Sequence, residues 1–316
     1  MIMPGKNQLV WITVLAAVTM VAWQNYVSGL SYFFQILFFA FAIFSFGIPH
    51  GALDHLVGEE IAKHRKSKFS LTKFLFNYLL SIVLYALLWY WFPQLSLLIF
   101  LMLSCWHFAE TDVAVVSGKS LITASLKLIY GLSVLAWLLW AHVAEVSAIL
   151  KHLIPVKSLF FVGWLAGVVH ASFILIISAI IILVALGLPL FTQQKTGYFL
   201  SKLPLVIILA CGYTLPLMPA FALYFAGWHS LITLYNIKGF IGYETISNKP
   251  LSILKLWLKA LPFSLLAIGG LLLTGYLLRH YAPLFDPLPL LFVFLSLITL
   301  PHMQVMHGLN SKLQVT

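Results

Sequence analysis

Long apolar stretches separated by short polar loops recur from one end of the 316-residue chain to the other. Hydrophobic residues make up 62% of the sequence and charged residues only 8%, whereas a soluble domain carries about 25% charged residues. So few charges cannot cover a water-facing surface, and a helix of about 20 apolar residues is long enough to cross a bilayer. The sequence therefore predicts an all-α, polytopic integral membrane bundle that forms a single domain over residues 1–316.

Ten membrane spans are predicted, with nine or eleven as alternatives because the sixth span is long and the seventh is short. The loops after the second, sixth and eighth spans hold many of the lysines, including Lys63, Lys195 and Lys202, while most of the opposite loops hold no Lys or Arg. By the positive-inside rule, both termini are cytoplasmic. The spans are placed at 9–25, 31–56, 72–92, 95–112, 121–141, 160–188, 201–214, 219–237, 256–279 and 288–308.

Four histidines lie on four different spans that all run towards the cytoplasmic side: His50, His107, His229 and His302. Each is about 5 to 8 residues from its helix end, so the four lie at similar depth. Polar groups inside a membrane are costly and usually face the bundle interior or a cavity. Four such imidazoles indicate a metal site, the alternative being an ordinary interhelical hydrogen bond at each one. Thiolate-free imidazole ligation suits Fe, Zn, Cu or Ni.

Nearby carboxylates are candidates to orient these imidazoles. Asp54 is four residues after His50 and Glu110 three after His107, so each pair shares a helix face. A carboxylate beside a ligating imidazole accepts the free ring N–H and fixes the tautomer. Asp112 is a third candidate for this supporting role. Asp54 and Asp112 have an alternative role, in which they cap helix ends or pair with loop lysines.

The remaining histidines rank lower. His55 and His307 each follow a candidate ligand by five residues, which turns them about 140° away on a straight helix. They are therefore the less favoured ligands. We expect His170 to be a packing residue. Four further histidines, in or beside loops, are expected to be solvated: His64, His142, His152 and His280.

The motifs that carry these residues have a recognisable order. IPHGALDH (48–55), WHFAETD (106–112), WHSLIT (228–233) and LPHMQVMH (300–307) resemble, in turn, the motifs of the Brp/Blh family, the multi-spanning β-carotene 15,15′-dioxygenases of bacteria and archaea. The resemblance runs from about residue 40 to 308. We take a family-like core of about 30–308, with the span at 9–25 as an extra N-terminal helix.

The resemblance implies a non-haem Fe(II) enzyme of a bacterial or archaeal inner membrane. Such an enzyme uses O₂ to split the central double bond of β-carotene into two retinal molecules, which supply a microbial rhodopsin. The family's iron-binding histidines fall on His50, His107 and His229, and its C-terminal Pro-His motif falls on His302. Residues near the histidines are candidates to line a tunnel for the polyene, although ordinary helix packing would explain each one: Phe46, Trp106, Phe108, Tyr224, Phe225, Trp228 and Thr233.

One departure from the family motif concerns a ligand. The family commonly reads HSxRH, but this chain reads HSLIT, with Ile232 and Thr233 in place of the arginine and second histidine. Either His302 or, with less support, His55 completes the coordination, or the chain is a divergent paralogue that cleaves or only binds another carotenoid. A membrane desaturase is disfavoured because it needs pairs of histidines three or four residues apart, and this chain has no such pair. A coupled transporter more often shows repeated halves, and we find no internal repeat.

Overall fold

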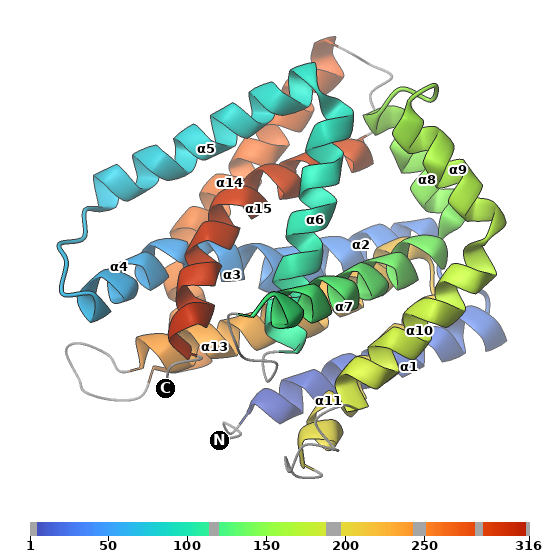
Figure 1. Cartoon of the computed structure of the whole chain (residues 1–316), viewed down its shortest axis with the longest axis horizontal. Helices are drawn as coiled ribbons and strands as arrows, with labels where there is room; N and C mark the ends of the chain where they lie inside the picture. Colours follow the sequence, from blue (N-terminus) through green and yellow to red (C-terminus); the bar gives the residue numbers. More distant parts are fainter. Residues whose placement is uncertain (1–4, 114–119, 188–196, 243–250, 282–286, 314–316) are drawn as a thin grey trace. The chain divides into compact units, whose positions relative to one another are not determined.

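The computed structural model describes residues 5–113, 120–187, 197–242, 251–281 and 287–313 (Figure 1). Every regular element within these ranges is a helix, and none of the described residues forms a β-strand. The prediction of an all-α, polytopic membrane protein is therefore confirmed. Among the described residues, eight helical stretches are long and apolar enough to cross a membrane. They are α1 (Lys6–Tyr26), Tyr32–His64, α5 (Leu71–Trp91), α6 (Pro93–Asp112), α7 (Leu121–Trp140), Leu217–Ile241, α14 (Ile253–Tyr281) and α15 (Pro287–Leu313).

Two of the ten predicted spans are not single long helices. The predicted span at 160–188 is a pair, α9 (Leu159–Val169) and α10 (Ala171–Gly187), bent by 84° at His170. The predicted span at 201–214 lies in α11 (Gly197–Thr214), whose apolar part begins at Leu200. The helix from Leu200 to Thr214 is only about 22 Å long, which is less than the roughly 30 Å thickness of the hydrocarbon core. The described residues thus hold eight spans, or nine with the bent pair, compared with a prediction of ten that allowed nine.

Two of the long stretches contain a π-helix beside a candidate ligand. Tyr32–His64 consists of α2 (Tyr32–Ala42), η1 (Ile43–Gly47), α3 (Ile48–Ala52) and α4 (Asp54–His64). Leu217–Ile241 consists of α12 (Leu217–Tyr224), η3 (Phe225–Ser230) and α13 (Leu231–Ile241). His50 follows η1, and His229 lies inside η3. π-Helices are rare and occur frequently at functional sites, so these turns mark the segments of interest.

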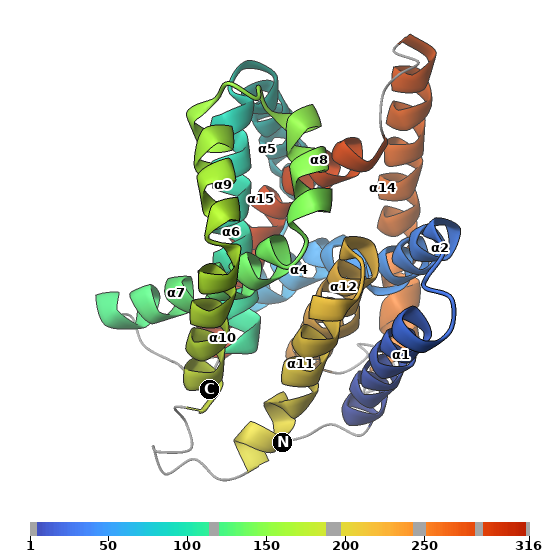
Figure 2. The ribbon, with the colours of Figure 1, turned by 90° about the vertical axis from the view of Figure 1, so that its right-hand side faces the viewer.

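The chain divides into two compact units, and the prediction of a single domain stays a prediction. The first unit comprises Met1–Phe46, Ser104–Ala148 and Val156–Ile232. Within it, α7 packs along α10, and α1 runs beside α11 (Figure 2). Helix α12 contacts α2, α11 and η3, which places η3 among the buried elements of this unit. The α8 helix (Val143–Leu153) begins in this unit and ends in the second, and it lies between the predicted spans at 121–141 and 160–188.

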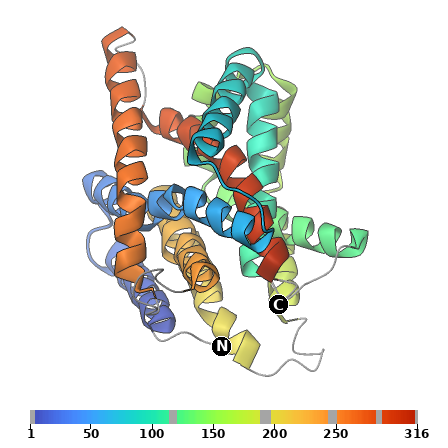
Figure 3. The same cartoon turned by 90° about the vertical axis from the view of Figure 1, so that its left-hand side faces the viewer.

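The second unit comprises Gly47–Leu103, Ile149–Pro155 and Thr233–Thr316. Here α15 packs against α5 and α4, and α14 packs against α3 (Figure 3). Polar side chains in this unit find partners inside it. The indole Nε1 of Trp89 donates to Ser296 Oγ at 2.8 Å, and the Tyr85 hydroxyl donates to Ser96 O at 2.7 Å. Such pairing is required because lipid offers no hydrogen bonds to buried polar groups.

Candidate functional site

Two of the four candidate ligands meet in the first unit. His107 on α6 and His229 in η3 are 3% and 0% exposed, and their ring centroids are 4.5 Å apart at an interplanar angle of 74°. Phe108 lies edge-on to His229 at 5.0 Å, and Phe225 stacks on it at 5.9 Å. The two imidazoles are thus held side by side in an aromatic surrounding that excludes water.

Asp112, at the end of α6, accepts three hydrogen bonds beside this pair. The hydroxyls of Tyr130 and Tyr224 donate to its Oδ2 at 3.1 and 2.9 Å, and Trp228 Nε1 donates to its Oδ1 at 2.7 Å. The carboxylate is 0% exposed, so these bonds replace its hydration. Since Tyr224 and Trp228 flank and belong to the π turn that carries His229, Asp112 anchors that turn to α6 and α7.

Two basic residues lie close to these carboxylates. Lys127 on α7 is only 4% exposed and interacts electrostatically with Glu110, which is also 4% exposed. Lys202 interacts electrostatically with Asp112, and the Nζ of Lys202 lies 5.5 Å from the centroid of the Trp228 ring. The prediction of Lys202 in a loop is wrong, because it lies within α11. Glu110 and Asp112 therefore each face a cation inside the first unit.

The other two candidate ligands meet in the second unit. His50 on α3 and His302 on α15 are 4% and 5% exposed, with ring centroids 4.8 Å apart at 86°. The Nδ1 of His302 lies 2.8 and 3.0 Å from the two carboxylate oxygens of Asp54, and the Tyr78 hydroxyl donates to Asp54 Oδ2 at 3.0 Å. The structure thus places Asp54 on the ring of His302, whereas helix spacing alone had paired it with His50.

The less favoured histidines have other surroundings. His55 Nδ1 lies 3.1 Å from Ala52 O, and its ring packs on Phe263 of α14 at 4.6 Å. These contacts with a backbone carbonyl and a phenyl ring are consistent with its lower rank. His307 is exposed on α15, unlike the four buried candidate ligands.

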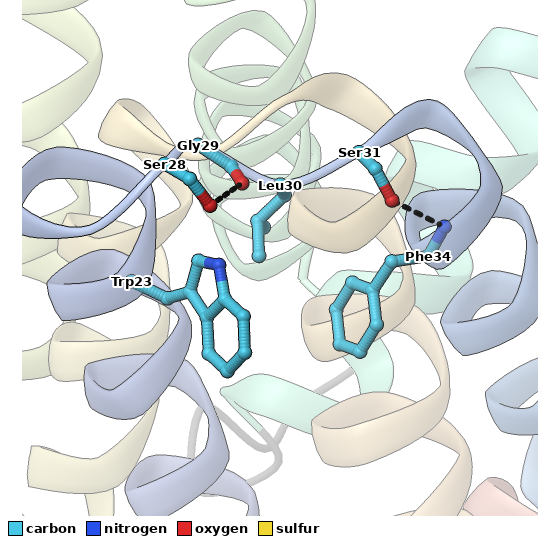
Figure 4. A pocket seen from close by; sticks show the side chains of 6 residues that line it. All are labelled: Trp23, Ser28, Gly29, Leu30, Ser31 and Phe34. Carbon is cyan, nitrogen blue, oxygen red and sulfur yellow. Dashed lines mark hydrogen bonds between the residues drawn. The ribbon is translucent and has the colours of Figure 1, made fainter.

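The candidate tunnel residues divide into two groups. Phe108 and Phe225 surround His229, and the Phe108 and Tyr224 rings meet edge-on at 5.1 Å. Trp228 and Thr233 are buried as well, whereas Phe46 and Trp106 are half-buried. Figure 4 shows a cavity of about 210 Å³ at the loop between α1 and α2, and no predicted tunnel residue lines it. Its lining consists of Trp23 on α1, Phe34 on α2 and the loop residues Ser28, Gly29, Leu30 and Ser31.

Two expectations about the remaining histidines are wrong. His142 was expected to be solvated but is 5% exposed, with Nδ1 2.7 Å from Leu138 O and Nε2 2.9 Å from Leu215 O. The ring lies between the end of α7 and the turn after α11, and its one N–H donates to one of these carbonyls according to the tautomer. His170 was expected to pack inside its helix but is exposed at the bend between α9 and α10.

Several residues of these networks are absent from the sequence-based candidates. Lys127 carried a usable signal, because a lysine in the middle of an apolar span is rare unless it has a partner. Tyr78 and Tyr130 carried none, since tyrosines are common in this sequence and their partners are 24 and 18 residues away.

Comparisons with known proteins concern the sequence of this chain and identify its family. The family model described as beta-carotene 15,15′-dioxygenase matches residues 41–310. A protein named beta-carotene 15,15′-dioxygenase from uncultured marine bacterium 66A03 is 41% identical over 66 residues, a match that covers 21% of this chain and 24% of that protein. No solved structure matches the chain. Since the matched range contains all four candidate ligands and covers most of the chain, this protein belongs to the β-carotene 15,15′-dioxygenase family.

Proposed function

We propose that this protein cleaves β-carotene at its central double bond with O₂ and releases two molecules of retinal. The observation that carries the proposal is the family match over residues 41–310, which includes every one of the four histidine motifs. Both oxygen atoms of O₂ end in the two aldehyde groups, so the reaction needs no other oxidant. The enzyme acts in a bacterial or archaeal inner membrane, with both termini cytoplasmic, and its product serves a retinal-binding rhodopsin.

We further propose that the cofactor is Fe(II), held by His50, His107 and His229 with His302 as the fourth ligand. The residues fit such an ion chemically. All four imidazoles are no more than 5% exposed, and neutral nitrogen donors without thiolates are ligands that non-haem iron accepts. When bound, the iron supplies the activation of O₂.

Carboxylates of this protein fix the tautomer and the position of those imidazoles. Asp54 engages Nδ1 of His302, so that this nitrogen carries the proton and Nε2 keeps its lone pair for an ion. Glu110, three residues after His107, orients the His107 imidazole. Asp112 holds the π turn of His229 in place through its hydrogen bonds with Trp228 and Tyr224.

The aromatic side chains provide the surface for the substrate. β-Carotene is an apolar rod that is soluble in the bilayer, and we propose that it enters laterally from the lipid. Phe108, Phe225 and the half-buried Trp106 and Phe46 then offer ring faces to the polyene near the imidazoles. Rings of this kind bury a large apolar area and fix orientation.

A second candidate function rests on Thr233. This residue is 1% exposed, and its hydroxyl has no hydrogen-bond partner within the described part of the chain. An imidazole at this position would be one helical turn after His229, where the family commonly has its second histidine. The alternative is a divergent paralogue that acts on another carotenoid or only binds one.

Expression in a bacterial host that makes β-carotene tests the proposal. We expect the orange colour to fade and retinal to appear on chromatography of the extract. His107→Ala should abolish retinal formation, whereas His170→Ala, which changes an exposed residue at a bend, should leave it unchanged. Persistent β-carotene without retinal, in cells that contain the folded protein, would overturn the dioxygenase proposal and favour the paralogue.

A further inference from the structure

The N-terminal helix α1 lies outside the matched range of residues 41–310, yet it touches the π turn that carries a candidate ligand. Thr13 on α1 directs its Oγ1 to within 3.2 Å of the Gly227 carbonyl oxygen in η3. The same hydroxyl lies 3.2 Å from Leu9 O of its own helix. Its single proton is therefore shared between the two carbonyls, each of which has lone pairs to accept it.

The contact is close because residue 227 is a glycine. A Cβ added to Gly227 would overlap Thr13 Cγ2, and it would lie 3.2 Å from Thr13 Oγ1 and 3.4 Å from Thr13 Cβ. Small residues at helix crossings let backbones approach in this way in membranes. Thr13 and Gly227 thus form a fitted crossing between α1 and η3.

The π turn is also held from its other sides. Trp228 and Tyr224 bind Asp112, and Ser230 Oγ donates to Phe225 O at 2.8 Å across the turn. His229 lies between these anchor points. A shift of η3 towards or away from α1 would therefore move the imidazole relative to His107, whose ring it contacts.

We propose that α1 supports the metal site, and that Thr13 and Gly227 are positioning residues that hold His229 in place for the ion. This inference rests on the proposed function in that it takes His229 as an iron ligand. It assigns to α1, a helix outside the family match, a role in that site.

Iron(II) titration of the purified, chelator-treated protein in detergent, under anaerobic conditions, tests the inference. Overpacking costs typically 1–3 kcal/mol, so we expect Gly227→Ala to weaken iron binding by about tenfold or more. The double variant Gly227→Ala with Thr13→Ala removes the overlapping atoms and should recover most of that loss. The visible spectrum of the Co(II)-substituted protein should change in Gly227→Ala and return in the double variant, which a general loss of stability would not produce.

A milder pair of variants keeps the test valid if Gly227→Ala fails to fold. Thr13→Val removes the hydroxyl at nearly constant volume and should weaken iron binding by about threefold, as expected for an interhelical hydrogen bond in a membrane. Thr13→Ser keeps the hydroxyl and should bind as the wild type does. Thr19→Val is the matched control, because Thr19 lies exposed on the same helix.

The outcomes separate the two proposals. The role of α1 is overturned if Thr13→Val binds iron as tightly as Thr19→Val does. It is also overturned if the double variant binds iron no better than Gly227→Ala. In both cases iron binding by the wild type still supports the metal site. If the folded wild type binds neither Fe(II) nor Co(II), the proposed metal site itself fails.

Discussion

Replacement of Asp112 by asparagine is the sharpest perturbation of the first unit. The side chains are nearly equal in size, but a carboxylate only accepts hydrogen bonds whereas an amide has one accepting oxygen and an NH₂ group that donates. Three donors converge on Asp112, two on Oδ2 and one on Oδ1. In either orientation of the amide, at least one donor faces the NH₂ group. The orientation that keeps both tyrosines leaves Trp228 Nε1 without an acceptor.

The magnitude follows from this lost bond. A hydrogen bond to a charged group contributes about 1.5–3 kcal/mol, and an unsatisfied buried donor costs about 1–3 kcal/mol. Because an unfolded membrane chain also finds partners for its polar groups, we expect Asp112→Asn to lower the free energy of unfolding by about 2–4 kcal/mol. Trp228→Phe in the same protein removes the opposed donor, so the double variant should cost at least about 1 kcal/mol less than the sum of the two single variants.

Equilibrium unfolding in mixed detergent and SDS micelles, followed by circular dichroism, measures these differences. Tyr130→Phe is the matched control, since it removes one donor and leaves no donor opposed; it should cost about 1 kcal/mol. An Asp112→Asn protein within about 0.5 kcal/mol of the wild type, or strict additivity with Trp228→Phe, would refute the reasoning.

Three other expectations concern single side chains. His142→Ala removes the ring N–H that donates to one of two carbonyls, Leu138 O or Leu215 O according to the tautomer. It should lower the free energy of unfolding by about 2 kcal/mol, as seen in the same micelle assay, with retinal yield per folded molecule unchanged. Tyr78→Phe removes one hydrogen bond to Asp54 and should slow retinal formation by less than about tenfold, since such a bond is worth about 1 kcal/mol; a rate equal to that of His302→Ala would contradict this. Thr233→His adds an imidazole one turn after His229 and should raise the affinity for iron in a titration; an unchanged or lower affinity would show that the position does not reach the ion.

The membrane helices were predictable because a helix that crosses a bilayer needs about 20 consecutive apolar residues, and such stretches can be seen in the sequence. The predicted span at 72–92 lies within one residue of α5, for example, and that at 121–141 within one of α7. The 84° bend at His170 was not predictable, because both halves of the pair are apolar and hydropathy carries no information about direction.

The candidate site stays a prediction, and the hydrogen-bond partners of its residues were predicted incompletely. The four histidines stood out because buried polar groups are rare in such a chain, and they are indeed buried. The partner of Asp54 lies 248 residues away on α15, beyond any rule of helix spacing. His142 was misjudged because its position near a loop said nothing of the carbonyls that α11 brings to it.

The π turn Phe225–Ser230 has a consequence for the evolution and engineering of this chain. A π turn fits one more residue into a helix than an α turn does, so deletion of one residue there would restore an α-helix. Because the π turn holds the extra residue locally, the α-helical segments on either side would keep their relative direction, and the residues of the turn itself would change their positions around the helix axis. His229, which lies inside the turn, would then point in another direction relative to the ring of His107. The number of residues in this stretch is therefore as constrained as the side chains that hold His229 in place.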